Sequence, residues 1–83
     1  MKREEKILAA AALGQDLAES GRRNQEELDY FFNSLKRIKK SERVEIILKE
    51  FGTGEEYNYE LKQMPFLGNK SAREDEIVGW KTV

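Results

Sequence analysis

The hydrophobic period of this chain changes at the glycine pair Gly52 and Gly54, and this change limits the folds that the chain can adopt. Before the glycines, apolar residues recur every three or four positions, as they do on one face of an α-helix. After the glycines, Tyr57, Tyr59 and Leu61 alternate with polar residues, as on a half-buried strand. A helical part is therefore followed by a β part, and the sequence predicts an α+β fold.

Two segments before the glycines predict long helices. Residues 2–20 are rich in Ala, Leu, Glu and Lys, and Gly21 follows as a candidate left-handed C-cap. In residues 24–40, Asn24 is a candidate N-cap, and apolar residues recur with a helical spacing. One face of the first segment carries small residues, which allow another helix to approach closely. We prefer an approach within the chain, and a homodimer through helix 2–20 is the alternative.

Residues 41–51 fit two different structures. As a helix they place on one face an apolar stripe made of Val44, Ile47, Leu48 and Phe51. As a strand they place on one face a different set, made of Val44, Ile46 and Leu48. We prefer the helix, because Ser41 can cap its start and Gly52 follows its end.

The β part consists of residues 57–64, which end at Pro65, and residues 76–83. Two neighbouring strands joined by a loop most simply form an antiparallel hairpin, and an isolated hairpin is too unstable to stand without helices against it. The sequence therefore predicts one α+β domain over residues 1–83, with three helices followed by a two-stranded antiparallel hairpin packed on them.

The composition argues against several kinds of chemistry. The chain has no cysteine and no histidine, which excludes thiolate and imidazole metal sites, disulfides and nucleophile pairs with a histidine base. We therefore expect a protein that is not an enzyme and that binds no metal or cofactor. The lack of disulfides fits a reducing cytoplasm, and no apolar run reaches the roughly 20 residues that a membrane span requires.

The spacing of Gly52 and Gly54 raises the question of a phosphate-binding loop, but the surrounding sequence argues against one. In such a loop a strand leads into a helix, whose N-terminus faces the anion. Here the expected order is helix first and strand after, and Glu55 and Glu56 follow directly, where they would repel phosphate. We expect the glycines to serve the turn, with Gly52 as a helix C-cap, and the two glutamates to face solvent or a basic partner.

Two sets of residues are candidates for binding. A partner-binding surface is predicted from aromatic and charged residues in the second half, namely Glu55, Glu56, Tyr57, Phe66, Lys70 and Arg73. Alternative nucleic-acid contacts are the cations of a basic stretch, namely Arg22, Arg23, Lys36, Arg37, Lys39 and Lys40. Three helices and a two-stranded wing would suit a winged-helix DNA-binding regulator, although the expected recognition helix, residues 41–51, is net acidic.

Two short motifs lie in the second half of the chain. Residues 48–54 read Leu-Lys-Glu-Phe-Gly-Thr-Gly, and the last four residues begin with Trp80 and end with Val83. Together they resemble a small domain of phages and integrative elements, found inside large polyvalent proteins and as short free-standing proteins. Such domains have a helix that ends in an aromatic residue and a glycine-rich turn, followed by a hairpin with a Trp-x-x-Val ending. The resemblance covers residues 41–83, implies a cytoplasmic location in a bacterial host and favours a helix for residues 41–51.

The preferred functional hypothesis follows from the missing catalytic side chains and this resemblance. We expect a small phage or mobile-element accessory protein that binds a host or phage protein, for example as a counter-defence inhibitor of a host system. A winged-helix-like DNA-binding regulator and a homo-oligomeric structural module are the alternatives. Nucleic acid is the less favoured partner, because the formal net charge of the chain is only −1.

Overall fold

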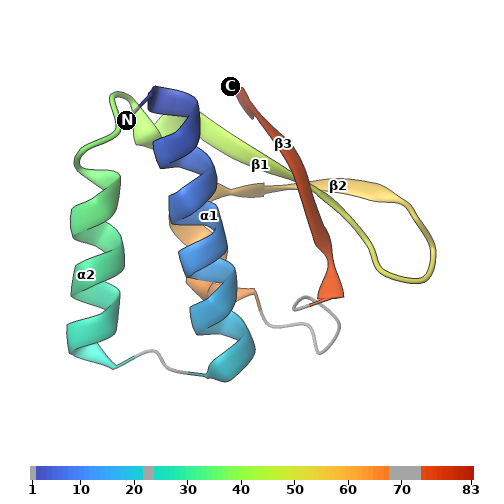
Figure 1. The fold of residues 1–83 in the computed structure, drawn as a ribbon, viewed down its shortest axis with the longest axis horizontal. Coiled ribbons are helices and arrows are strands. Elements are labelled where there is room, and N and C mark those ends of the chain that lie inside the picture. Colours follow the sequence, from blue (N-terminus) through green and yellow to red (C-terminus); the bar gives the residue numbers. More distant parts are fainter. Residues whose placement is uncertain (1, 22–23, 68–73) are drawn as a thin grey trace.

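In the part of the chain that the structure describes, two α-helices are followed by a three-stranded antiparallel sheet (Figure 1). The computed structural model describes residues 2–21, 24–67 and 74–83. Along the chain the elements are α1 (Arg3–Ser20), α2 (Gln25–Leu35), the 3-10 helix η1 (Ser41–Arg43), β1 (Val44–Lys49), β2 (Glu56–Glu60), the 3-10 helix η2 (Leu61–Phe66) and β3 (Glu76–Thr82). Helix α1 lies beside α2 and also contacts η2 and β3, so it joins the helical part to the sheet.

The ends of the two helices are set by local signals. Helix α1 stops at Gly21, whose φ of 70° is left-handed. Helix α2 starts after Asn24, whose side chain accepts a hydrogen bond from the backbone N–H of Glu27 at 2.9 Å. Helix α2 ends at Leu35, before the expected end at residue 40, because the following residues tighten into turns and Lys40 takes a left-handed φ of 57°.

The third helix expected from the sequence is wrong, because residues 44–49 form the central strand of the sheet. Within β1, Val44, Ile46 and Leu48 are buried, whereas Ile47 is half-buried on the opposite face. The β-branched residues favour extended backbone, and strands on both sides satisfy the backbone N–H and C=O groups of β1. The expectation of a helix that came from the phage-domain resemblance is wrong for the same reason.

The two-stranded hairpin expected from the sequence is also wrong. The strand order is β2-β1-β3, so β2 and β3 each pair antiparallel with β1 and not with each other. Ile46 lies between Tyr59 on one side and Trp80 on the other, and the register with β3 shifts between Ile47 and Leu48. Three helices and a two-stranded hairpin are thus replaced by two helices and a three-stranded sheet.

The core lies between one face of the sheet, helix α1 and η2. Gly14 of α1 stands where a Cβ atom would come within 2.5 Å of the Met64 Cβ atom and 2.9 Å of the Phe31 ring. Because no side chain fits there, the small-residue face of α1 permits close packing inside the molecule. The core contains the fully buried Phe31, Ile46, Leu48, Leu61 and Met64.

Candidate functional site

The loop between β1 and β2 is a tight turn held by its own backbone. The N–H of Glu50 donates to the carbonyl of Glu55 at 2.8 Å, and the N–H of Gly54 donates to the carbonyl of Glu50 at 3.0 Å. Gly52 and Gly54 have φ values of 98° and 75°, which side chains disfavour. The glycines therefore serve the turn, but the expectation that Gly52 caps a helix is wrong, because a strand precedes it.

Asp75, just before β3, fixes this turn to the rest of the fold. Asp75 is 5% exposed, and its carboxylate accepts two hydrogen bonds, from the backbone N–H of Phe51 at 3.0 Å and from the Tyr57 hydroxyl at 2.5 Å. Its backbone carbonyl accepts a third from the Gln15 side chain of α1 at 2.9 Å. One buried residue therefore connects the turn, β2, the start of β3 and α1.

The environment of Tyr57 favours its protonated form. Burial and the hydrogen bond to Asp75 raise the pKa of the Tyr57 phenol above its usual value, and the negative charges of Asp75 and Glu50 add to this effect. Tyr57 therefore stays a hydrogen-bond donor to Asp75 at all pH values at which an ordinary tyrosine is protonated.

This raised pKa predicts a loss of stability at alkaline pH. The Tyr57 contribution is fully present below the ordinary tyrosine pKa of about 10 and is lost as the pH rises through the higher folded-state pKa. We expect the free energy of unfolding of the wild type to fall more steeply above about pH 10 than that of Tyr57→Phe. Urea unfolding of both proteins at stepped pH values measures this difference, and parallel pH profiles would contradict the assignment.

Carboxylates gather around the turn and form a surface that we call the acidic tip, made of residues 50–56 and 74–76. Its acidic side chains are Glu50, Glu55, Glu56, Glu74, Asp75 and Glu76. Two hollows lie on it, one of about 460 Å³ beside Phe51 and one of about 230 Å³ beside Tyr57. Among these acids stands Phe51, which is 63% exposed.

The acidic tip brings together only part of the predicted partner-binding surface. Glu55 and Glu56 are exposed on it, and the half-buried Tyr57 adjoins it. Phe66 is 40% exposed on η2 and lines neither hollow of the tip. Lys70 and Arg73 lie outside the described residues.

Two residues of the acidic tip were missed by sequence reasoning. The helix expected for residues 41–51 would turn Phe51 towards the core with the rest of its apolar stripe, but Phe51 is 63% exposed. Asp75 stands in a run of charged residues, 73–76, that gives no sign of which carboxylate is buried. The only available signal was its place directly before a strand, a position at which many polar residues stand.

The predicted nucleic-acid contacts lie at the other end of β1. Lys36, Arg37, Lys39 and Lys40 are exposed between α2 and η1, before the start of the central strand, whereas the acidic tip follows its end. Arg22 and Arg23 lie outside the described residues. The winged-helix arrangement is wrong, because the segment expected to be the recognition helix is a strand with neighbours on both sides.

Neither the side chains of the described residues nor similarity to known proteins points to a metal site or a family. Residues 2–21, 24–67 and 74–83 contain no group of three or more His, Cys, Asp or Glu residues arranged to hold a metal ion. No helix in this described part of the chain is long and apolar enough to span a bilayer. A comparison with protein-family models, curated proteins and solved structures found no match in any of the three.

Proposed function

We propose that this protein is a non-enzymatic protein-binding module whose acidic tip docks onto a basic partner protein, with Phe51 as the apolar anchor. The observation that carries the proposal is a large aromatic side chain, 63% exposed, on a turn whose backbone is hydrogen-bonded to the buried carboxylate of Asp75. A few aromatic side chains commonly supply most of the binding energy of an interface.

The rigidity of the turn supports this proposal. The backbone N–H of Phe51 donates a hydrogen bond to the Asp75 carboxylate. Phe51 also directly follows Glu50, whose backbone N–H is hydrogen-bonded to the carbonyl of Glu55 across the turn. A backbone segment that is already ordered loses less conformational entropy when it binds. An exposed phenylalanine in a mobile loop would lack this advantage.

The surrounding charge supports a basic rim on the partner. Glu74 and Glu76 line the hollow beside Phe51, where the cation Lys49 also lies, and Glu55 and Glu56 line the second hollow. Carboxylates around an apolar anchor attract a partner whose pocket for Phe51 is edged by Lys or Arg, and they repel acidic partners and phosphate groups.

The setting that we propose is a phage or mobile element in a bacterial host, where the protein acts as an accessory factor, for example as a counter-defence inhibitor. This part of the proposal rests on the resemblance of residues 41–83 to the phage domain. The Phe-Gly-Thr-Gly motif that carries much of the resemblance is the turn of the acidic tip. The partner is then a basic protein of the host or the phage.

Substituting Phe51 tests the proposal. We expect Phe51→Ala to fold normally and to bind the partner about 30-fold more weakly, since removal of an anchor residue commonly costs about 2 kcal/mol. Proteins captured from a bacterial lysate by immobilised wild type and by Phe51→Ala are compared by quantitative mass spectrometry. The affinity of each protein that depends on Phe51 is then measured with the purified pair.

The matched control is Phe66→Ala, which removes another exposed phenylalanine at 40% exposure, outside the tip. Its binding should stay within about two-fold of the wild type. Equal loss of binding in both variants, or loss only in Phe66→Ala, overturns the role of the acidic tip. Capture that depends on Arg37 and Lys40 and weakens steeply with salt would instead indicate nucleic acid.

A further inference from the structure

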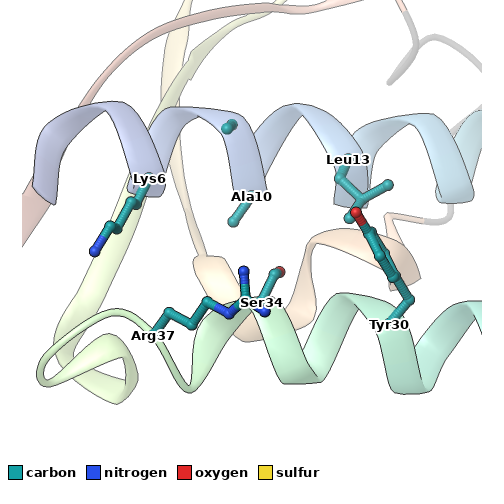
Figure 2. Close-up of a pocket in the computed structure, with 7 residues that line it drawn as sticks. Lys6, Ala10, Leu13, Tyr30, Ser34 and Arg37 are labelled. Atoms are coloured by element: carbon teal, nitrogen blue, oxygen red, sulfur yellow. The ribbon is translucent and has the colours of Figure 1, made fainter. Parts of the chain in front are cut away.

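A groove runs between α1 and α2 on the surface of the helical part. Figure 2 shows its first portion, about 550 Å³ in volume, with Lys6, Ala10 and Leu13 on the α1 side and Tyr30, Ser34 and Arg37 on the α2 side. Tyr30 reaches across towards Leu13, and it is 68% exposed. The groove adjoins the small-residue face at Gly14, which is already packed against Phe31 and Met64, and the buried Ala10 belongs to both.

The groove continues past Tyr30 towards the other end of the helix pair. A second hollow of about 410 Å³ shares Leu13 and Tyr30 with the first, and it is also lined by Glu26 and Glu27. The middle of the groove is therefore apolar and aromatic. Cations stand at one end, where α1 begins and α2 ends, and carboxylates stand at the other end.

We propose that this groove is the interface of a homodimer, in which a second copy of this chain docks against it in the opposite direction. In a two-fold interface every contact occurs twice. If residue i of the first copy contacts residue j of the second, residue j of the first copy also contacts residue i of the second. Arg37 of each copy then faces Glu26 of the other, so that two equivalent charge pairs form. Tyr30 and Leu13 of both copies meet near the two-fold axis.

The spacing of the charges suits this arrangement. Glu26 lies in the first turn of α2 and Leu35 ends the helix roughly 14 Å away, at about 1.5 Å per residue, and Arg37 lies two residues farther on. A two-fold axis midway between Glu26 and Arg37 lies within about one helical turn of Tyr30. The exposed aromatic side chain is thus placed where the two copies come closest and where its burial contributes most.

The charge pattern of the groove also favours a second copy over a partner whose surface carries charges of only one sign. A uniformly acidic partner would be repelled at Glu26 and Glu27, and a uniformly basic partner would be repelled at Lys6 and Arg37. A second copy in the reverse direction meets the opposite charge at both ends. The groove lies on the helix pair, whereas the acidic tip lies beyond β1, so this inference does not depend on the proposed function.

Charge reversal and its rescue test the dimer. Arg37→Glu alone and Glu26→Arg alone each create like-charge pairs twice per dimer, and we expect each to raise the dimer dissociation constant by about ten-fold. The double variant Arg37→Glu/Glu26→Arg restores opposite charges and should return the constant to near the wild-type value. Sedimentation equilibrium of the wild type and these variants over a range of concentrations provides the constants.

Three further variants separate the interface from general charge effects. Lys39→Glu and Glu42→Arg reverse exposed charges that do not line the groove, and both should dimerise like the wild type. Tyr30→Ala removes the apolar centre without a change of charge and should weaken the dimer by about ten-fold. Circular dichroism establishes that each variant is folded before its association is compared.

Several results would overturn the proposal. One such result is a wild type that stays a monomer at concentrations up to about 1 mM, as it would if another protein or a small molecule were the natural occupant of the groove. Another such result is a wild-type dimer whose dissociation constant the single charge reversals leave unchanged. A double variant whose dissociation constant stays as high as that of the single variants would also overturn the proposal. Raising the salt concentration should weaken the wild-type dimer, because exposed charge pairs are screened.

Discussion

Truncating Ile46 to alanine should cost about 4 kcal/mol in the free energy of unfolding, whereas the same change at Ile47 should cost about 1 kcal/mol. Ile46 is 0% exposed and lies in the sheet between Tyr59 and Trp80, on the face that packs into the core. Its truncation leaves a cavity among side chains that cannot close around it. Since small domains are stable by only about 5–15 kcal/mol, the Ile46 variant loses a large part of its stability.

The neighbouring isoleucine is a matched control for this measurement. Ile47 points to the open face of the sheet, opposite Asn58 and Gly79, and it is half-buried. The two variants differ by one position and lose the same atoms, so their denatured states are closely similar. Unfolding in urea, with the midpoint and slope of each transition, gives both free energies.

This pair also distinguishes a strand from a helix at residues 41–51. In the helix expected from the sequence, Ile47 belongs to the core stripe and Ile46 does not, so the larger loss would occur at Ile47. The strand gives the reverse order. A larger loss at Ile47, or equal losses at the two positions, would contradict the register of β1.

The wrong helix has a clear physical origin. Val44 and Leu48 belong both to the helical stripe and to the alternating pattern, so only the residues between and after them distinguish the two structures. The competing signals were local: Ser41 as a cap and Gly52 as a stop. Residues 44–49 form a strand because they pair with β2 and β3, which come later in the chain, and no local pattern shows this pairing.

Other parts of the fold were predictable because their signals are local. The left-handed Gly21 after α1 and the capping side chain of Asn24 before α2 both act within a few residues of their position. The alternation around Tyr57 and Tyr59 also gave an extended segment, where β2 runs from Glu56 to Glu60. The expected strand 57–64 is wrong in its second half, because residues 61–64 belong to the 3-10 helix η2. The pairing of these elements, by contrast, depends on contacts across the whole molecule.

The candidate site was predictable in its charges and unpredictable in its architecture. Glu55 and Glu56 were expected to face solvent or a basic partner, and both are exposed. The sequence could not show that residues 74–76 would come to lie beside them, because that requires β3 to pair with β1. It also could not show that Phe51 would be exposed, since a helical stripe places this residue in the core.

Replacing Asp75 by alanine should lower the free energy of unfolding by about 3 kcal/mol and also weaken partner binding, although Phe51 itself is unchanged. The substitution removes the carboxylate that accepts hydrogen bonds from the Phe51 N–H and from the Tyr57 hydroxyl, on a residue that is only 5% exposed. Without them the turn loses its connection to β3, and binding must then order it again. Urea unfolding measures the loss of stability, and the hydrogen exchange rate of the Phe51 amide measures the loss of order in the turn.

Two further variants identify the cause of the loss. Glu74→Ala removes an exposed carboxylate next to Asp75 and should change stability by no more than about 0.5 kcal/mol. Tyr57→Phe removes one of the two bonds, so it should cost about half as much, and its effect should largely vanish when Asp75 is already alanine. If Asp75→Ala leaves the Phe51 amide protected while binding is lost, the carboxylate contacts the partner directly. If protection and binding are lost together, Asp75 acts by holding Phe51 in place, which is the role that its burial and its hydrogen bonds indicate.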